Sequence, residues 1–487
     1  MSCGTFFEIA TNLGLRKHPL QKPTHCSLTV MKKNLVSSIF VPVLLLSALP
    51  GEIRAQEFFR DLGTSRSSSG FGPVTPSEFS YEDASPSGLS PLRPGQELNE
   101  AEAAEEANRY NFAIGPVQFG LALGIGLEYN DNITLSDDNE LEDFILRPIL
   151  DVQAVWYLSE LNTIKLSLGA SYAKYFEHTQ YDSRSVLLSP NSELAFTFFL
   201  GQVMFTVRDR FSYQEDTYDT PLLDNIVSPY RRFENQIGIE MDWAINDKVN
   251  LAVGFDHYNL WVIGDDYPLQ PRAIETVFVK PSYNLAPGLK LGLNVSYSYI
   301  DFTSNDRPDG FGVLAGPFIQ WQISEYTNLY LEGGYQALEF EQLGLSQEES
   351  NAVDGVLFND QNSNSYYIKF EINNKPSDIF DHRLSFSRTT ELAFYSNYYE
   401  LYHVEYDANW KVFQHAEIGP VLFYEYYTTS GDLGESAQRV GAALGMRYHF
   451  SNSITLGLDY RFIAQDSDVP NNDYKQNVAF LSLYYKF

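Results

Sequence analysis

The sequence predicts an all-β fold: a transmembrane antiparallel up-and-down β-barrel of about eighteen strands, with sixteen as the alternative count. Three observations predict it. Apolar and polar residues alternate with a period of two in many segments of residues 112–487. The connections between these segments are alternately long and short. A short apolar segment near the N-terminus is organised like a secretory signal.

The clearest strand pattern runs from Val117 to Tyr129, where every odd position is apolar and every even position is small or polar. This run is too long for an ordinary strand of about five to six residues. It fits a tilted transmembrane strand of about 9–11 residues. Similar segments continue to the end of the chain, and we count eighteen. We expect the small inner residues of the first segment to leave room in the lumen.

The connections provide an independent test of this topology. In a bacterial barrel, short periplasmic turns alternate with longer extracellular loops. Here long connections such as NDNITLSDDNELE and EDTYDTPLLDNIVSPY alternate with short ones such as SELN, IND and APG. The series of nine long loops and eight short turns predicts that both termini are periplasmic. Sixteen strands is the alternative if the hairpin from His382 to Trp410 does not form.

The region before the barrel divides into three predicted segments. Residues 31–55 contain two lysines, a short apolar run and a small-residue cleavage motif, which predicts a signal peptide. Residues 1–30 are then an upstream extension from an early start codon, and both cysteines, Cys3 and Cys26, precede the cleavage motif. Residues 56–111 are rich in Ser, Pro, Gly and Glu and predict a disordered periplasmic linker with one short acidic helix. A plug or a partner-docking arm is the alternative for this linker.

Composition limits the classes of function. The formal net charge is −30 and 15% of the residues are aromatic, whereas disordered acidic chains are poor in aromatic residues. The charge therefore belongs to a folded protein. A polyanionic partner would be repelled, so nucleic acid is excluded. The chain has no run of eighteen apolar residues, which excludes a helical membrane protein.

The tryptophans are predicted to form membrane-interface girdles, because indole prefers the boundary between lipid and water. Four of them have the apolar parity and lie within a few residues of a short turn, which predicts a periplasmic girdle. The fifth, Trp261, lies at the loop end of its strand. The girdle residues are Trp156, Trp243, Trp261, Trp321 and Trp410.

The last predicted strand resembles the signal that outer-membrane barrels present to their assembly machinery. It ends at Phe487, and apolar Leu481, Leu483 and Tyr485 occupy alternate positions before it. We therefore expect the barrel assembly machinery and outer-membrane lipid to be partners of this chain.

The first strand and its loop, GLEYNDNITLSDDNELEDFILRPIL, resemble the opening of the family of outer-membrane proteins named β-barrel porin 2. The motif that carries the resemblance runs from Glu128 to Ile133, and the resemblance covers about residues 113–487. It implies an outer-membrane pore, often encoded beside exopolysaccharide or capsule genes. It implies no catalytic residues.

The charged residues with inward parity are the candidates for lining a pore, because eighteen strands enclose an aqueous channel. Either they pair with one another on a hydrated wall, or they form a constriction with a transverse field. Arg208 and Arg210 are the best candidates for an anion-facing patch, and they could equally pair with carboxylates on neighbouring strands. The candidates are Arg147, Asp151, Lys165, Glu193, Arg208, Arg210, Glu240, Asp242, Arg447, Asp459 and Arg461, and the same parity holds for Glu332, Lys369, Glu371, Arg383, Glu405 and Asp407.

These features predict a non-enzymatic outer-membrane channel for passive passage of small solutes, or of polysaccharide during export, without cofactor or metal. One alternative is a barrel that acts through its extracellular loops, with the loop of residues 341–363 as the functional or pore-narrowing segment. The other is an outer-membrane hydrolase, which needs a nucleophile, a base and an orienting partner. The histidines of the mature chain show no such pattern: His178, His257, His382, His403, His415 and His449.

Overall fold

The computed structural model describes residues 110–159, 161–216, 230–264, 271–303, 307–341, 362–393, 396–431 and 434–487. The predicted upstream extension, the signal peptide and nearly all of the predicted linker lie outside the described residues, as does most of the long loop of residues 341–363. Within the described part of the chain, no helix has the length and apolarity of a membrane span.

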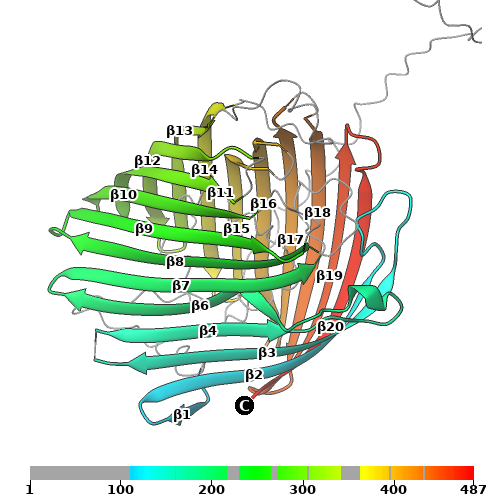
Figure 1. Ribbon diagram of the computed structural model, residues 1–487. Helices are drawn as coiled ribbons and strands as arrows, with labels where there is room; N and C mark the ends of the chain where they lie inside the picture. The colour runs from blue at the N-terminus through cyan, green and yellow to red at the C-terminus, as the bar shows by residue number, and fades with distance from the viewer. Residues whose placement is uncertain are drawn as a thin grey trace, which may run out of the picture. The chain divides into compact units, whose positions relative to one another are not determined.

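The described residues form one antiparallel sheet of twenty strands that closes on itself (Figure 1). β2 (Val117–Asn130) pairs with β3 (Asp143–Tyr157) on one side and with β20 (Tyr474–Lys486) on the other. β4 (Thr163–Ser171) and β5 (Lys174–Tyr175) both pair with β3 and count as one interrupted strand. The short β1 (Phe112–Ile114) folds back on β2. The closed wall therefore has eighteen strands, which confirms the predicted barrel and excludes sixteen.

The remaining strands follow one another around the wall, each paired with the next, and β6 pairs with β4. They are β6 (Leu187–Leu200), β7 (Val203–Asp216), β8 (Tyr230–Ala244), β9 (Val249–Val262), β10 (Arg272–Ala286), β11 (Leu289–Phe302), β12 (Gly310–Ser324), β13 (Thr327–Phe340), β14 (Ser363–Ser377), β15 (Phe380–Leu392), β16 (Tyr398–Phe413), β17 (Ala416–Thr429), β18 (Ser436–His449) and β19 (Ile454–Ser467). A 3-10 helix, η2 (Thr179–Tyr181), lies between β5 and β6.

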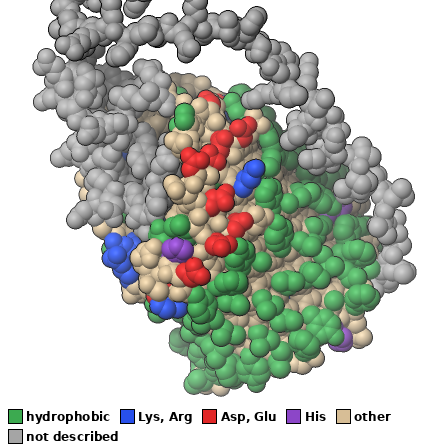
Figure 2. Space-filling model, turned by 90° about the vertical axis from the view of Figure 1, so that its right-hand side faces the viewer, with side chains coloured by type: hydrophobic (Ala, Val, Ile, Leu, Met, Phe, Trp, Pro, Cys, Tyr) green, Lys and Arg blue, Asp and Glu red, His purple; other side chains and the backbone are tan. Residues whose placement is uncertain are grey.

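The alternating sequence gives the wall an apolar outside and a polar inside. Along β2, Leu123, Ile125 and Leu127 are 45%, 51% and 40% exposed, and they point outward. Figure 2 shows hydrophobic side chains covering one side of the barrel as a broad band. Such a continuous apolar surface matches lipid, not water. Closure into a cylinder also supplies the strands with backbone hydrogen-bond partners, which a bilayer cannot supply.

The inner glycines of β2 do not leave open space in the lumen, which corrects the expectation from the sequence. The ring of Phe480 lies so close to Gly126 that an added Cβ would come within 2.2 Å of it, and the ring of Tyr484 would lie 2.6 Å from a Cβ at Gly124. Large rings on one strand thus fill the space that glycine leaves on its neighbour, and they cover its backbone. The lining of the lumen depends on both strands, so it could not be derived from one.

The motif from Glu128 to Ile133 fastens the first strand to the last at the loop end of the barrel. The carboxylate of Asp131 accepts hydrogen bonds from the backbone N (2.6 Å) and Nδ2 (2.7 Å) of Asn477. Gln476 Nε2 donates to Asn130 Oδ1 at 3.2 Å and to the carbonyl of Asn132 at 2.9 Å. These bonds extend the β2–β20 seam beyond the strands themselves.

At the opposite end of the same seam, Asn111 performs a similar task. Its Oδ1 accepts a hydrogen bond from the backbone N of Leu121 at 3.1 Å, and its Nδ2 donates to the carbonyls of Leu121 (3.1 Å) and Phe487. Asn111 therefore joins β2 to the end of β20, just before β1 folds back.

A cluster of five polar side chains interrupts the apolar outer wall on β7–β10. Asn235 Nδ2 donates to Asp209 Oδ1 at 2.5 Å. His257 Nδ1 lies 3.2 Å from Glu275 Oε1, and Asn259 Nδ2 lies 2.7 Å from His257 Nε2. The five side chains have the parity of the exposed apolar residues on their strands. Their mutual hydrogen bonds reduce the cost of placing polar groups on this surface.

Candidate functional site

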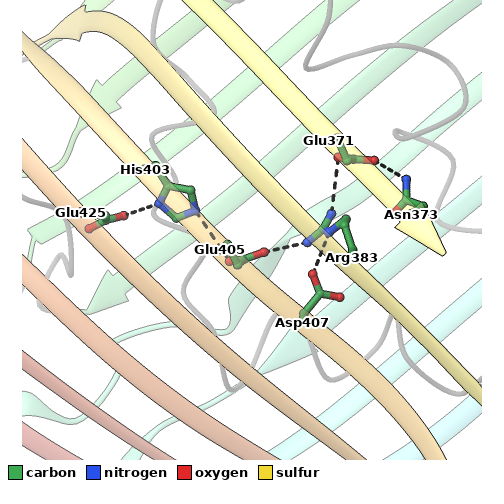
Figure 3. Close-up of polar contacts among 7 residues, drawn as sticks. All are labelled: Glu371, Asn373, Arg383, His403, Glu405, Asp407 and Glu425. Atoms are coloured by element: carbon green, nitrogen blue, oxygen red, sulfur yellow. Dashed lines mark hydrogen bonds and ion pairs between the residues drawn. The ribbon is translucent and has the colours of Figure 1, made fainter. Parts of the chain in front are cut away.

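The inner wall of β14–β17 carries an extended ion-pair network (Figure 3). Arg383 on β15 donates from Nη2 to Glu405 Oε1 and from Nε to Asp407 Oδ2, both at 2.7 Å. Its Nη1 lies 4.0 Å from Glu371 Oε2 on β14. The register explains the contacts, because Arg383 lies directly opposite Asp407, and Glu405 is one inward position further along β16. One guanidinium thus compensates carboxylates on both neighbouring strands.

The network continues toward β18 through a histidine. His403 Nδ1 is 3.0 Å from Glu425 Oε1, and its Nε2 is 3.8 Å from Glu405 Oε2. Arg439 Nη1 lies 3.3 Å from Glu425 Oε2. A continuous series of ion pairs and histidine contacts therefore runs around the wall from β14 to β18. Buried charges of this kind are tolerated only when they are paired and hydrogen-bonded.

Arg208 and Arg210, the predicted anion-facing pair, each contact a carboxylate. Arg208 Nη2 is 3.1 Å from Asp256 Oδ1, and its Nη1 is 3.9 Å from Glu240 Oε2. Arg210 Nη2 is 3.1 Å from Glu193 Oε2. Of the two readings of the sequence, this geometry corresponds to mutual pairing. Asp256 lies on β9, two strands away from Arg208, and therefore beyond the neighbouring strands that the sequence suggested.

The other predicted pore-lining residues lie on the same inner surface, mostly in pairs. Arg147 Nε donates to Glu128 Oε2 at 2.6 Å, and Arg447 Nη2 donates to Asp459 Oδ1 at 2.7 Å. Arg461 Nη2 donates to Gln476 Oε1 at 3.1 Å. Three further candidates are partly buried and have the inward parity: Asp151, Lys165 and Asp242.

The predicted interface and terminal residues lie on the outer surface. The five tryptophans are 39–45% exposed, with Trp156, Trp243, Trp321 and Trp410 near short turns and Trp261 packed 5.5 Å from the ring of Phe233. On β20 and just after it, 45–49% of each predicted signal residue is exposed: Leu481, Leu483, Tyr485 and Phe487.

Sequence reasoning missed several residues of the inner wall. No role on the inner wall was predicted for His403, although it has the parity of Glu405 and Asp407 and lies in the middle of β16. Glu425 and Arg439 were missed as its neighbours. Both occupy inward positions in the alternation of β17 and β18, which the sequence shows. The contacts between them depend on strand register, which no local sequence pattern reports.

At the end of the barrel that carries the long loops, Arg307 connects two loops. Its Nη2 donates to the carbonyls of Ala393 (2.8 Å), Ser396 (3.3 Å) and Asn397 (3.4 Å), and its guanidinium lies 4.0 Å from the centre of the Phe302 ring. Arg307 belongs to the β11–β12 loop and its acceptors to the β15–β16 loop. Several strands separate these loops on the wall, so both must lean over the opening to meet.

The C-terminal end of β15 no longer pairs with β14 and contacts β13 instead. The last β14–β15 pair is Ile368 with Arg388, whereas β15 continues to Leu392. Gln336 on β13 replaces the missing strand contact: its Nε2 donates to the carbonyl of Thr390 at 2.8 Å, and its Oε1 accepts from the backbone N of Thr390 at 3.0 Å. The β15–β16 hairpin is thereby held against the inner side of the wall.

Below this hairpin, apolar side chains line the inner wall of β9–β15. This cluster is almost completely buried, and it consists of Tyr258, Leu260, Ile274, Ile300, Phe302, Leu338, Phe340 and Leu392. This apolar cluster lies near the loops, and charged Arg272 shares its level, because Leu260 and Phe302 are its register partners. Among the described residues, no group of three or more His, Cys, Asp or Glu is arranged to hold a metal ion.

Comparison with known proteins identifies solved structures of similar architecture. No protein-family model matches the chain, and no curated protein matches it. Pseudomonas aeruginosa OpdK, solved with vanillate, has a TM-score of 0.43 at 10% identity, covering 76% of this chain and 99% of that one. P. aeruginosa OccK2 (OpdF), in complex with glucuronate, also has a TM-score of 0.43 at 10% identity, covering 77% and 100%. P. aeruginosa OccK5 (OpdH) has a TM-score of 0.40 at 11% identity, covering 76% and 98%. At these values the likeness carries no functional argument, and the resemblance to β-barrel porin 2 stays a prediction.

Proposed function

We propose that this protein is a passive outer-membrane channel for small hydrophilic solutes. The main support for this proposal is a closed eighteen-strand wall that is apolar on the outside and carries paired positive and negative side chains on the inside. Eight strands close around their own side chains, whereas sixteen to eighteen leave an aqueous path. The inner charged side chains keep that path hydrated. Because positive and negative side chains are paired, the channel should prefer neither anions nor cations strongly.

Planar-bilayer recording on the purified full chain tests this function. Discrete single-channel steps are expected. Silent bilayers would overturn the channel, provided that boiled and unboiled samples still migrate differently on a gel, which shows that a closed barrel is present.

Two neighbouring residues on β15 offer a matched test of the conduction path. With Cys3 and Cys26 replaced by serine, Ser385→Cys places a thiol on the inner wall and Leu384→Cys places one on the outer wall, where Leu384 is 38% exposed. A charged methanethiosulfonate reagent should reduce the conductance of the first variant and leave that of the second unchanged. Equal effects on both would contradict conduction through the lumen.

The contact of Arg307 with the β15–β16 loop supports a second candidate function, a barrel that acts through its extracellular loops. Silent bilayers with an intact barrel would favour it. The resemblance to β-barrel porin 2 separately supports a role in exopolysaccharide or capsule export. In that case, deletion of the gene should lower the amount of surface polysaccharide, and an unchanged amount would exclude the role.

The outer-membrane location, periplasmic termini and terminal assembly signal belong to the same proposal. The outward row ending at Phe487 supports them. Phe487→Ala should lower the amount of barrel in the outer-membrane fraction, and Lys486→Ala, with the inward parity, is the matched control. Equal amounts of both variants would contradict the signal.

A further inference from the structure

The outer polar cluster on β7–β10 lies within the apolar band of the barrel, and it consists of Asp209, Asn235, His257, Asn259 and Glu275. On the loop side of Asn259, the next outward residue is Trp261. On the loop side of Asn235 it is Phe233, whose ring centre lies 5.5 Å from that of Trp261. Because indole marks the boundary between lipid and water, the cluster lies on the lipid side of that boundary. Toward the short turns the outward residues are apolar again, such as Phe255, which is 40% exposed.

Asn235 uses both of its amide hydrogens within its own barrel. Its Nδ2 donates to Asp209 Oδ1 at 2.5 Å and to the carbonyl of Arg210 at 3.2 Å. The amide oxygen of Asn235 accepts no hydrogen bond from any residue that the structure describes. An amide oxygen without a donor is costly in hydrocarbon, so Asn235 needs a donor from outside its barrel.

Asn259 lies directly opposite Asn235 and has the complementary group to offer. Its Nδ2 lies 2.7 Å from His257 Nε2 and must be the donor, because an amide nitrogen does not accept. His257 therefore carries its proton on Nδ1, which lies 3.2 Å from Glu275 Oε1. The second amide hydrogen of Asn259 has no acceptor among the described residues.

We propose that the outer wall of β7–β10 is the interface with a second copy of this chain, related by a two-fold axis along the membrane normal. In a two-fold interface, contacts are reciprocal. Asn259 of one copy donates its remaining amide hydrogen to the amide oxygen of Asn235 of the partner subunit, and the same bond forms in the other direction. Side-chain amides join membrane-spanning helices in the same way.

Charge distinguishes a second copy from lipid as the occupant of this surface. The cluster contains the carboxylates of Asp209 and Glu275 and no lysine or arginine, so anionic lipid headgroups are repelled. Acyl chains offer no hydrogen bonds. The two carboxylates lie on β7 and β10, at the edges of the cluster, and each already has a hydrogen-bonding partner within it, so the central contact joins the amides.

Apolar side chains surround the amides and extend the contact surface. Ile237, Phe255 and Val277 are 45%, 40% and 47% exposed on the three strands β8, β9 and β10. They pack equally well against lipid and against a second copy, so they do not decide between the two. The hydrogen bonds between the amides supply the preference for a second copy.

Sedimentation equilibrium of the purified full chain in density-matched detergent tests this interface, because it reports the mass of the protein alone. The unmodified chain should have twice the mass of a single chain. The double variant Asn235→Leu, Asn259→Leu should raise the concentration of half-dissociation at least about tenfold. Gln438→Leu is the matched control and should leave it unchanged, because Gln438 is an exposed outward amide on β18, on the opposite side of the barrel.

Disulfide cross-linking in outer membranes tests the same contact without the leucine variants. With Cys3 and Cys26 replaced by serine, one chain carries Asn235→Cys and a co-expressed chain carries Asn259→Cys. Oxidation should join them into a covalent dimer. Leu458→Cys is the control, since Leu458 is 47% exposed on the outer face of β19 and should not cross-link.

Heat-dependent gel migration of each variant shows that the barrel has formed. A single-chain mass of the unmodified protein without cross-linking in the membrane would overturn the interface. So would unchanged dissociation of the leucine variant, or equal cross-linking through Leu458→Cys. A disulfide of Asn235→Cys or Asn259→Cys with a different protein would overturn the second copy as the occupant.

Discussion

The two sides of the inner wall satisfy their charges in different ways. On β14–β18, Arg383 contacts two carboxylates at 2.7 Å, and the series continues through His403 to Glu425. On β7–β10, Arg208 and Arg210 are paired, whereas Nε and Nη1 of Arg272 have no hydrogen-bond partner among the described residues. Both sides arise from the same two-residue alternation, so the difference comes from which residues the register brings opposite one another.

This difference concerns single groups, since Arg208 and Arg210 on β7–β10 meet carboxylates just as Arg383 does on β15. Paired charges hold neighbouring strands together, whereas two nitrogens of Arg272 have no hydrogen-bond partner among the described residues. Four predictions test this contrast, from the largest expected effect to the smallest.

Removal of the central cation of the satisfied side should have the largest effect. Arg383→Ala leaves Glu405 and Asp407 largely buried, at 11% and 16% side-chain exposure, without their main cation. Breaking such a pair costs about 3–5 kcal/mol. Urea unfolding in detergent measures the loss, and neutralising both carboxylates in the same chain should restore part of it. A loss below about 1 kcal/mol would mean that this network is not structural.

Replacing an inner glycine by a larger residue should lower the free energy of unfolding equally on both sides, because on both sides an aromatic ring packs against the glycine. A Cβ at Gly254 would lie 2.3 Å from Phe278, and one at Gly441 would lie 2.0 Å from Phe423. Gly254→Val and Gly441→Val should each lose about 1–3 kcal/mol in urea unfolding. Gly419→Ala is the control, since its Cβ would meet no atom closer than 3.5 Å. Unequal losses would show that the two sides differ in packing as well as in charge.

Loss of the contact between the β11–β12 and β15–β16 loops should have a local effect. Arg307→Ala removes hydrogen bonds to three carbonyls in the β15–β16 loop. Hydrogen bonds to charged groups contribute about 1.5–3 kcal/mol, here mainly to loop ordering. Proteolysis of intact barrels should therefore be several times faster in this loop, while global unfolding stays nearly unchanged. Unaltered cleavage would show that the loops hold their positions without Arg307.

Removal of Arg272 should change stability least, and in the opposite direction. Arg272→Leu replaces a buried guanidinium, two of whose nitrogens have no hydrogen-bond partner among the described residues, by an apolar side chain between Leu260 and Phe302. Such a change is neutral or stabilises by about 1 kcal/mol. Urea unfolding in the absence of solute measures it. A clear loss of stability would place Arg272 with Arg383 and remove the contrast between the two sides.

Much of the fold was predictable because its causes are local. Alternation along Val117 to Tyr129 predicted a transmembrane strand, and repetition of the pattern predicted eighteen strands, as observed. The aromatic rings that fill the space beside Gly124 and Gly126 were not predictable, because Tyr484 and Phe480 belong to a strand more than 350 residues later in the chain. Likewise, the outward group around His257 was missed because one or two polar residues do not disturb the alternation of a strand.

The amino-acid sequence by itself determined which face of each strand meets lipid, because neighbouring side chains on a strand point to opposite faces. It also determined that the wall must close, because open edges leave backbone groups unbonded in a bilayer. Only the tertiary structure decided which inner charges meet. A shift of register by two residues keeps every side chain on its face and changes every partner, so only the observed register brings Arg383 opposite Asp407.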